Sequence, residues 1–311
     1  MPIKRPFPVN PVLSTIAIRF TNAAFIGDRV MPLQSVPEEK FLYNDFSKTS
    51  VFNYVDTEVG RTGRPKTLEW QSEQKESSVR DHALRGELPM SDIEAAARQP
   101  GSIDPEAETV EMLSDCIKLG REVRVARQAQ NRDNYPVDQR IALGVDDKFS
   151  NPDADLISLV SQALDKPLMR PNKMVFGQAA WTLFRQHPQI VKATLKNSGD
   201  AGMATRMAVA ELFELEAVEV GPARYNAVKP GQNEQLAYIW GPHLSLLYVN
   251  ERATPRAGVS WGYTARFGTP WAGSMFDKDI SAQGGLDIRA GERLRELVVA
   301  PQCGYFFENC I

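Results

Sequence analysis

Few residues of this chain have side chains suited to nucleophilic or metal chemistry. There are three histidines and three cysteines among 311 residues: His82, His187, His243, Cys116, Cys303 and Cys310. No HExxH or CxxC spacing joins any of them, so neither a zinc site nor a disulfide framework is indicated. We therefore expect structural roles for the histidines, reduced thiols for the cysteines, a buried Cys116, and neither metal nor cofactor.

Two glycine-containing segments are the other candidates for chemistry. Residues 60–63 and 199–202 resemble phosphate-binding loops only in their glycines, since neither fits GxGxxG or GxxxxGK[ST]. The second precedes an expected helix, where weak anion binding is conceivable, but a plain loop is the simpler reading. No GxSxG elbow is present. The sequence thus favours a protein that is not an enzyme, and an enzyme with an unrecognised site stays open as the distant alternative.

Composition narrows the class of protein further. Hydrophobic residues make up 42% of the chain and charged residues 24%, values typical of a folded protein with a sizeable core. The net charge of −3 argues against a dedicated nucleic-acid binder but allows weak, non-specific contact with DNA held nearby. No apolar run is long enough to span a bilayer, and the first residues do not form a signal peptide.

The first 90 residues are predicted to form an arm and a hairpin that extend away from the core of the subunit. Prolines at positions 2, 6, 8 and 11 suggest an extended arm over residues 1–40. Within it, the alternating Ile16, Ile18 and Phe20 predict a short strand or a segment lying on another surface. Residues 41–80 look like a long hairpin with a turn at 60–65 and a return strand at 67–71. Because a lone two-stranded ribbon is marginal in water, it needs a second surface in the same subunit or in a neighbour.

A long helix follows a short one expected at residues 91–98. Asp104 can cap it, Pro105 suits its first position, and apolar residues keep helical spacing to about residue 130. At about 26 residues it exceeds the usual globular helix. We interpret Arg121, Arg124 and Arg127 as positive charges that complement the dipole at its C-terminal end.

The rest of the chain mixes helices and strands without a sustained βαβ order, so the predicted class is α+β. Helices are expected at residues 153–165, 179–186, 189–196 and 205–215. Strands are expected at residues 173–176, 218–220, 236–240, 244–249, 259–267 and 296–300.

Four stretches in this order resemble the major capsid proteins of tailed phages, whose Hong Kong-type fold encapsulins and herpesvirus shell proteins share. They are residues 59–70 (VGRTGRP to LEW), 168–188 (LMRPNKMVFG to HP), 262–268 (GYTARFG) and 295–309 (RELVVAP to GYFFEN). The resemblance implies an N-terminal arm at 1–40, an extended loop at 41–89, a peripheral domain with its spine helix at 90–150, an axial domain at 151–285, and C-terminal strands at 286–311 returning to the peripheral domain.

The resemblance also implies what the protein does. It implies self-assembly through pentamers and hexamers into an icosahedral shell around double-stranded DNA, in the virion, after assembly in the host cytoplasm. It implies a separate scaffolding protein, a portal and, in some relatives, a cement protein. An encapsulin-like compartment shell is the nearer alternative. The candidate intersubunit contacts lie near the loop tip: Arg61, Arg64, Lys66 and Trp70. Lys66 is also a formal candidate for a covalent cross-link, although a salt bridge is simpler.

Overall fold

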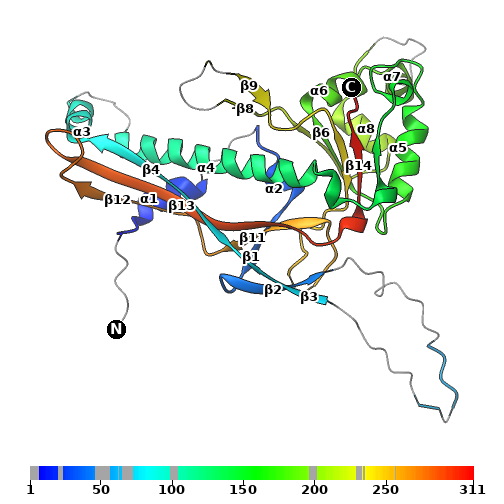
Figure 1. The fold of residues 1–311 in the computed structure, drawn as a ribbon, viewed down its shortest axis with the longest axis horizontal. Coiled ribbons are helices and arrows are strands. Elements are labelled where there is room, and N and C mark those ends of the chain that lie inside the picture. Colours follow the sequence, from blue (N-terminus) through cyan, green and yellow to red (C-terminus); the bar gives the residue numbers. More distant parts are fainter. Residues whose placement is uncertain are drawn as a thin grey trace.

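The structure is a computed structural model of the 311-residue chain. It describes residues 7–19, 24–45, 57–61, 63–64, 73–98, 104–195, 202–228, 233, 235–255 and 257–311. Two five-stranded sheets, joined by one long helix, make up most of the described fold. Figure 1 shows the result as an elongated molecule with a compact helical unit at one end.

The first sheet, called the long sheet below, is organised around one 14-residue strand. Its strands are β1 (Leu33–Val36), β4 (Arg80–Pro89), β11 (Gly262–Phe267), β12 (Trp271–Asp277) and β13 (Gly285–Val298). β13 pairs with β4 along one edge, while β11 and β12 follow one another along its other edge. The chain bends between β11 and β12 at Gly268, whose φ of +72° strongly favours glycine.

The long helix α4 (Pro105–Ala129) confirms the prediction of a spine of this length. The Asp104 carboxylate accepts a hydrogen bond from the Glu106 backbone N–H at 3.1 Å, and Pro105 occupies the first turn. Its buried residues recur every three or four positions and pack on β4 and β13 (Figure 1). They include Arg121, which lies two turns before the helix end. The interpretation of Arg121 and Arg124 as dipole charges was therefore wrong, and only Arg127 lies in the last turn.

The segment near residues 13–25 was expected to be a short strand or to lie on another surface. Its first part is the helix α1 (Pro11–Arg19), so the strand alternative was wrong there, and Phe20 lies outside the described residues. Asn10 caps it through its side-chain oxygen, which accepts from the Val12 N–H at 2.9 Å. Leu13 and Ala17 then fall one turn apart on the buried side, against β12 and α4. An alternating run of apolar residues fits a helix or a strand, and here the cap decides. The expectation that this segment lies on another surface is confirmed.

The second sheet, called the compact sheet, has its strands in the order β5-β14-β10-β6-β7. These are β5 (Arg140–Ala142), β14 (Gly304–Glu308), β10 (Leu244–Leu247), β6 (Lys173–Gly177) and β7 (Ala217–Gly221). One face packs against the four helices α5 (Leu156–Asp165), α6 (Gln178–Phe184), α7 (Pro188–Leu195) and α8 (Arg206–Leu212). The opposite face packs against the C-terminal end of α4 and the segment around α2 (Gly27–Val30). The long helix therefore belongs to the cores of both sheets.

The remaining elements are short. They are α3 (Met90–Ala97), the pairs β2 (Lys40–Asp45) with β3 (Glu73–Ser78) and β8 (Arg224–Asn226) with β9 (Leu236–Tyr238), and the 3-10 turns η2 (Arg132–Asn134), η3 (Val137–Gln139), η4 (Val145–Asp147) and η5 (Pro301–Cys303). Within the described ranges, no helix combines the length and apolar content needed to cross a bilayer.

Sheet membership differs from the expected division of the chain at residue 285. β11 and β12 precede that point but belong to the long sheet beside α4. β14 follows it but lies in the compact sheet, because η5 turns the chain away after β13. Only β13 of the last strands joins the sheet of the spine helix. Pairing between distant segments, and not position in the sequence, decides where each strand goes.

Candidate functional site

Two of the four candidate contact residues can be located in the structure. Arg61 and Arg64 are both exposed: Arg61 lies within, and Arg64 directly follows, a turn in which the Gly63 N–H donates to the Gly60 carbonyl at 2.8 Å. Neither forms an ion pair with any residue that the structure describes. Lys66 and Trp70 lie outside the described residues, as does the expected return strand at 67–71. Figure 1 places residues 57–61 well away from both sheets.

The base of the predicted hairpin is firmly held by the subunit itself. β2 and β3 pair antiparallel from Lys40 opposite Ser78 to Asp45 opposite Glu73. Phe41 is buried in a small apolar cluster with Val36, Tyr263 and Leu297 of the long sheet. The Asn44 N–H donates to the Pro255 carbonyl at 3.0 Å. The prediction of an antiparallel ribbon that lies on another surface is thus confirmed for its base.

A groove opens beside this base. It has a volume of about 420 Å³ and is lined by residues 35–38, 40–42 and 254–255. Leu42, next to the buried Phe41 on the same strand, exposes 53% of its surface there. An exposed leucine beside a groove of this size provides apolar surface that a second protein segment can cover.

The buried carboxylate of Glu122 links the spine helix α4 to two other segments of the chain, one at residues 26–27 and one at Trp240. Glu122 on α4 accepts hydrogen bonds from the Ile26 N–H at 2.9 Å, the Gly27 N–H at 2.7 Å and the Trp240 Nε1–H at 2.7 Å. Burial raises the pKa of its carboxyl group, and these donors oppose the rise. A Cβ atom on Gly27 would lie 2.6 Å from the Glu122 oxygen, so glycine permits this close approach.

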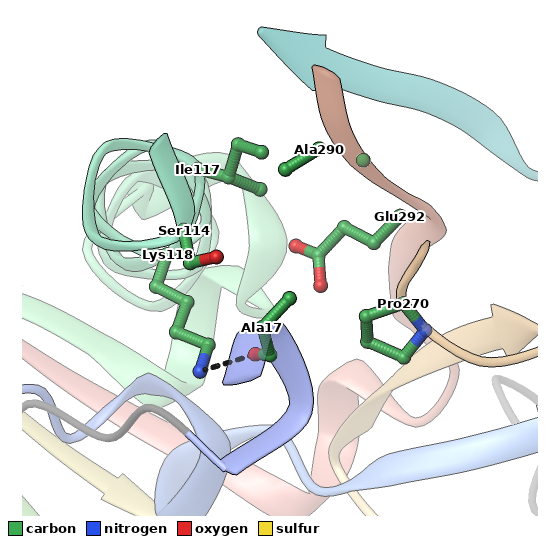
Figure 2. A pocket seen from close by; sticks show the side chains of 8 residues that line it. Ala17, Ser114, Ile117, Lys118, Pro270, Ala290 and Glu292 are labelled. Carbon is green, nitrogen blue, oxygen red and sulfur yellow. Dashed lines mark hydrogen bonds between the residues drawn. The ribbon is translucent and has the colours of Figure 1, made fainter. Parts of the chain in front are cut away.

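A second buried network joins α4 to β13. Arg121 contacts Glu292 at 3.5 Å and Asp28 at 3.1 Å, and Arg124 contacts Glu296 at 2.8 Å. Figure 2 shows Glu292 pointing towards α4 beside a cavity of about 10 Å³, near the smallest volume that admits one water molecule. One of its oxygens, Oε1, is buried without a hydrogen-bond partner among the described residues.

The pKa of Glu292 gives a test of this network. Burial raises it above the ordinary value of 4.5, and the charges of Arg121 and Arg124 oppose the rise. A raised folded-state pKa means that the folded protein holds the proton more tightly than the unfolded chain, so stability is lost as pH rises through that pKa. We expect the free energy of unfolding of the wild type, relative to Glu292→Gln, to be constant below about pH 4.5 and to fall above it.

Urea unfolding at a series of pH values measures this difference. Glu94→Gln is the matched control, because Glu94 is about half exposed and, among the described residues, pairs with Arg98 at the end of α3. The same pH dependence for Glu292→Gln as for Glu94→Gln would contradict the assignment of Glu292 as a buried, titrating carboxyl.

Among the described residues, the histidines and cysteines do not come together in a reactive centre. Burial raises the pKa of the Cys303 thiol to about 11 and raises that of Cys310 further, so both stay protonated at neutral pH. Cys116 is exposed, contrary to expectation, because it lies on the side of α4 away from the buried residues Val110, Ser114 and Ile117. Nowhere in the described ranges do three or more His, Cys, Asp or Glu residues gather as metal ligands do.

The buried networks were missed by the sequence reasoning, although a signal was present. The apolar positions Val110, Ile117 and Val125 define the buried side of α4, and the same spacing places Arg121 on it. A charged residue at an expected core position predicts a buried partner of opposite charge. The partners Glu292 and Glu296 lie more than 170 residues further along the chain, so the sequence does not identify them.

Comparison with known proteins gives two full-length relatives and a similar solved structure. The major capsid protein of Pseudomonas phage JBD67 is 37% identical over 306 residues, which cover 98% of each chain. That of Burkholderia phage BcepMu is 30% identical over 313 residues, covering 97% of this chain and 96% of that protein. The crystal structure of a phage-related protein from Bordetella bronchiseptica RB50 matches 98% of this chain and 99% of its own, with a TM-score of 0.77 at 23% identity. A scan against protein-family models finds no match.

Proposed function

The chain belongs to the family of phage major capsid proteins, and from this premise we propose that copies of it assemble through pentamers and hexamers into a closed icosahedral shell around phage DNA. The observation that carries the proposal is the 37% identity to a major capsid protein over 98% of both chains. Both curated relatives are phage proteins, which favours a virion shell over a storage compartment.

The geometry supports a division of the subunit into two domains. We assign the long sheet with α4 to the peripheral domain and the compact sheet with α5 to α8 to the axial domain, following sheet membership instead of a cut at residue 285. The helix α4 contributes side chains to the cores of both parts and so joins them into one unit. Head-to-tail contacts between such units close into rings when the rotation between neighbours divides a full turn.

The hairpin is the device that we propose for contact with a neighbour. Its base is fixed by the subunit's own core, whereas the exposed tip cations Arg61 and Arg64 have no internal partner among the described residues. We propose that these two, with Lys66 and Trp70, contact an adjacent subunit. A single exposed ion pair contributes only about 0–1 kcal/mol, but a shell repeats each contact many times, which raises the effective concentration of every further contact.

Charge reversal at the tip tests this role. We expect Arg64→Glu to reduce the yield of closed shells at physiological salt, because it replaces an attraction to acidic groups of the neighbour by a repulsion. Sedimentation and electron microscopy of the assembly products measure the yield. Arg98→Glu on α3 is the control, since Arg98 is an exposed arginine whose only ion pair among the described residues is with Glu94. Normal shells from Arg64→Glu would rule out this contact.

The partners that we propose follow from the closed shell. A separate scaffolding protein guides curvature during assembly in the host cytoplasm, a portal occupies one vertex, and a cement protein stabilises the outer surface in some members of the family. Packaged DNA contacts the shell without sequence preference, in keeping with the net charge of −3.

Negative-stain electron microscopy of the purified chain, expressed with its scaffolding protein, tests the proposed function directly. We expect uniform shells, tubes or capsomer rings. A stable monomer at high concentration in the presence of the scaffold would contradict it.

A further inference from the structure

A basic pocket lies where three distant segments meet. It has a volume of about 200 Å³ and is walled by the C-terminal half of α4, the start of β4 and the last third of β13. It is lined by Arg80 and His82 from β4, by Arg124, Arg127 and Gln128 from α4, and by Arg295 and Glu296 from β13. On α4 the spacing of three and four residues puts all three side chains on one side of the helix. None of the buried networks described above explains why basic groups gather here.

The charges in this pocket do not balance. Glu296 is the one carboxylate in the wall, and Arg124 engages it through Nε at 2.8 Å. In the part of the chain that the structure describes, Arg80, Arg127 and Arg295 have no ion-pair partner. Three guanidinium groups thus remain around the space without a counter-charge. Like charges held this close disfavour one another unless an anion joins them.

A buried hydrogen-bond donor without an acceptor also indicates that an anion binds in this pocket. Arg124 holds Glu296 through Nε, but its Nη2 is buried and has no hydrogen-bond partner among the described residues. Buried donors in folded proteins almost always have an acceptor, so each exception calls for an explanation. An oxygen-rich anion in the pocket would supply that acceptor and would neutralise the excess positive charge in one step.

The chemistry of the wall selects among anions. A guanidinium presents a planar fork of donors that matches the oxygens of phosphate and carboxylate. A carboxylate has two oxygens and a single charge, whereas a phosphate offers three or four oxygens and up to about two charges, which suits three guanidinium groups without an ion pair and one unsatisfied Nη2. We propose that this pocket is a binding site for a phosphate group, held by Arg80, Arg124 and Arg127.

His82 supplies a reporter inside the pocket. Burial lowers the pKa of its imidazole, and the neighbouring charges of Arg124 and Arg80 lower it further, against the opposing charges of Glu296 and Asp81. A bound phosphate adds negative charge beside the ring, so His82 becomes easier to protonate when the site is filled. Phosphate itself takes up a proton and loses negative charge in the same pH range, so the wild type is compared with His82→Gln at each pH. The wild type should bind phosphate more tightly relative to His82→Gln as the pH falls below neutrality.

Equilibrium dialysis with radiolabelled inorganic phosphate, at constant ionic strength in chloride, tests the site on the purified protein in whatever assembly state it has. We expect saturable binding of one phosphate per subunit. The double variant Arg80→Gln with Arg127→Gln removes two charge-assisted hydrogen-bonding groups and should weaken binding by at least about tenfold. The control removes two exposed arginines elsewhere, Arg98→Gln with Arg252→Gln, and should bind phosphate as the wild type does.

Two sources of phosphate are separated by a second arm of the experiment. A short DNA duplex is added as a competitor of labelled phosphate. Binding of inorganic phosphate without displacement is the expected result, because a backbone phosphodiester has two free oxygens and one charge, as a carboxylate does. Displacement would mean that the site accepts a backbone phosphodiester, which would overturn the selection by charge; this arm rests on the proposed function. Absence of saturable binding, or equal binding by the Arg80/Arg127 double variant, overturns the inference.

The dialysis result does not depend on shell formation. A protein that forms shells but binds no phosphate refutes only the phosphate site, and a protein that binds phosphate but never assembles refutes only the proposed function.

Discussion

Replacing Glu122 by alanine should destabilise the subunit by about 4 kcal/mol, the largest effect that we expect from one side chain. The substitution leaves three donors, the N–H groups of Ile26, Gly27 and the Trp240 indole, without their acceptor. Each buried donor that loses its partner costs roughly 1–3 kcal/mol, and the costs are not fully additive. Chemical unfolding of the purified subunit measures the change.

Two further variants separate the carboxylate from the space that it fills. Glu122→Gln keeps the shape but turns an amide nitrogen towards one of the donors, so we expect an intermediate loss. Glu111→Ala is the matched control, since Glu111 lies exposed on the same helix and should change stability by less than about 0.5 kcal/mol. Equal stability of Glu122→Ala and Glu111→Ala would show that the network contributes nothing.

The elements that the sequence predicted well carry their signals locally. The cap at Asp104, Pro105 and the spacing of apolar residues define α4 almost to the residue. The buried strand expected at residues 173–176 is β6, which is buried along its whole length. The first strand of the hairpin base, β2, follows from the alternating aromatic residues Phe41 and Tyr43, whereas its partner β3 was not predicted, because the return strand was expected at 67–71. In each case, neighbours within one or two turns or strand repeats are enough to specify the element.

Other elements depend on partners far away in the sequence. β4 was not predicted because Arg80–Pro89 is mostly polar, with a charged residue at about every second position and a glycine in the middle. It becomes a strand because ten of its residues pair with β13, about 200 positions later. Strand pairing over such a distance leaves no local pattern to find. β12 and residues 285–295 of β13 were also missed, although these two strands pair with each other across a short connection.

The candidate sites show the same limit. The tip residues Arg61 and Arg64 could be selected as candidate contacts from the sequence, because the turn and its charges are adjacent there. The basic pocket was not, because its residues come from β4, α4 and β13 and meet only in the folded chain. In the sequence, Arg124 was interpreted as a charge at the helix end, whereas in the structure it forms an ion pair with Glu296.

Shortening the hairpin should abolish shell assembly while the subunit still folds. The truncation replaces residues 46–72 by Asn-Gly, a two-residue turn that joins Asp45 to Glu73, the last pair of the β2–β3 ladder. The apolar cluster around Phe41 and the hydrogen bond from Asn44 to Pro255 lie before the cut and remain intact. We therefore expect the circular dichroism and unfolding midpoint of the wild-type subunit, but no closed shells by electron microscopy.

The two readouts together decide what the hairpin does. A subunit that unfolds after truncation would mean that residues 46–72 belong to its own core, which would contradict a role in contact with neighbours. Normal shells from a folded, truncated subunit would mean that the ring and shell contacts lie elsewhere, and the groove beside the base would become the next surface to change. Since Leu42 is exposed in that groove, Leu42→Asp would then test whether its apolar surface is covered in the shell. Loss of assembly with retained folding separates the two tasks of this segment, because the base then stabilises the subunit and the remainder joins it to another copy.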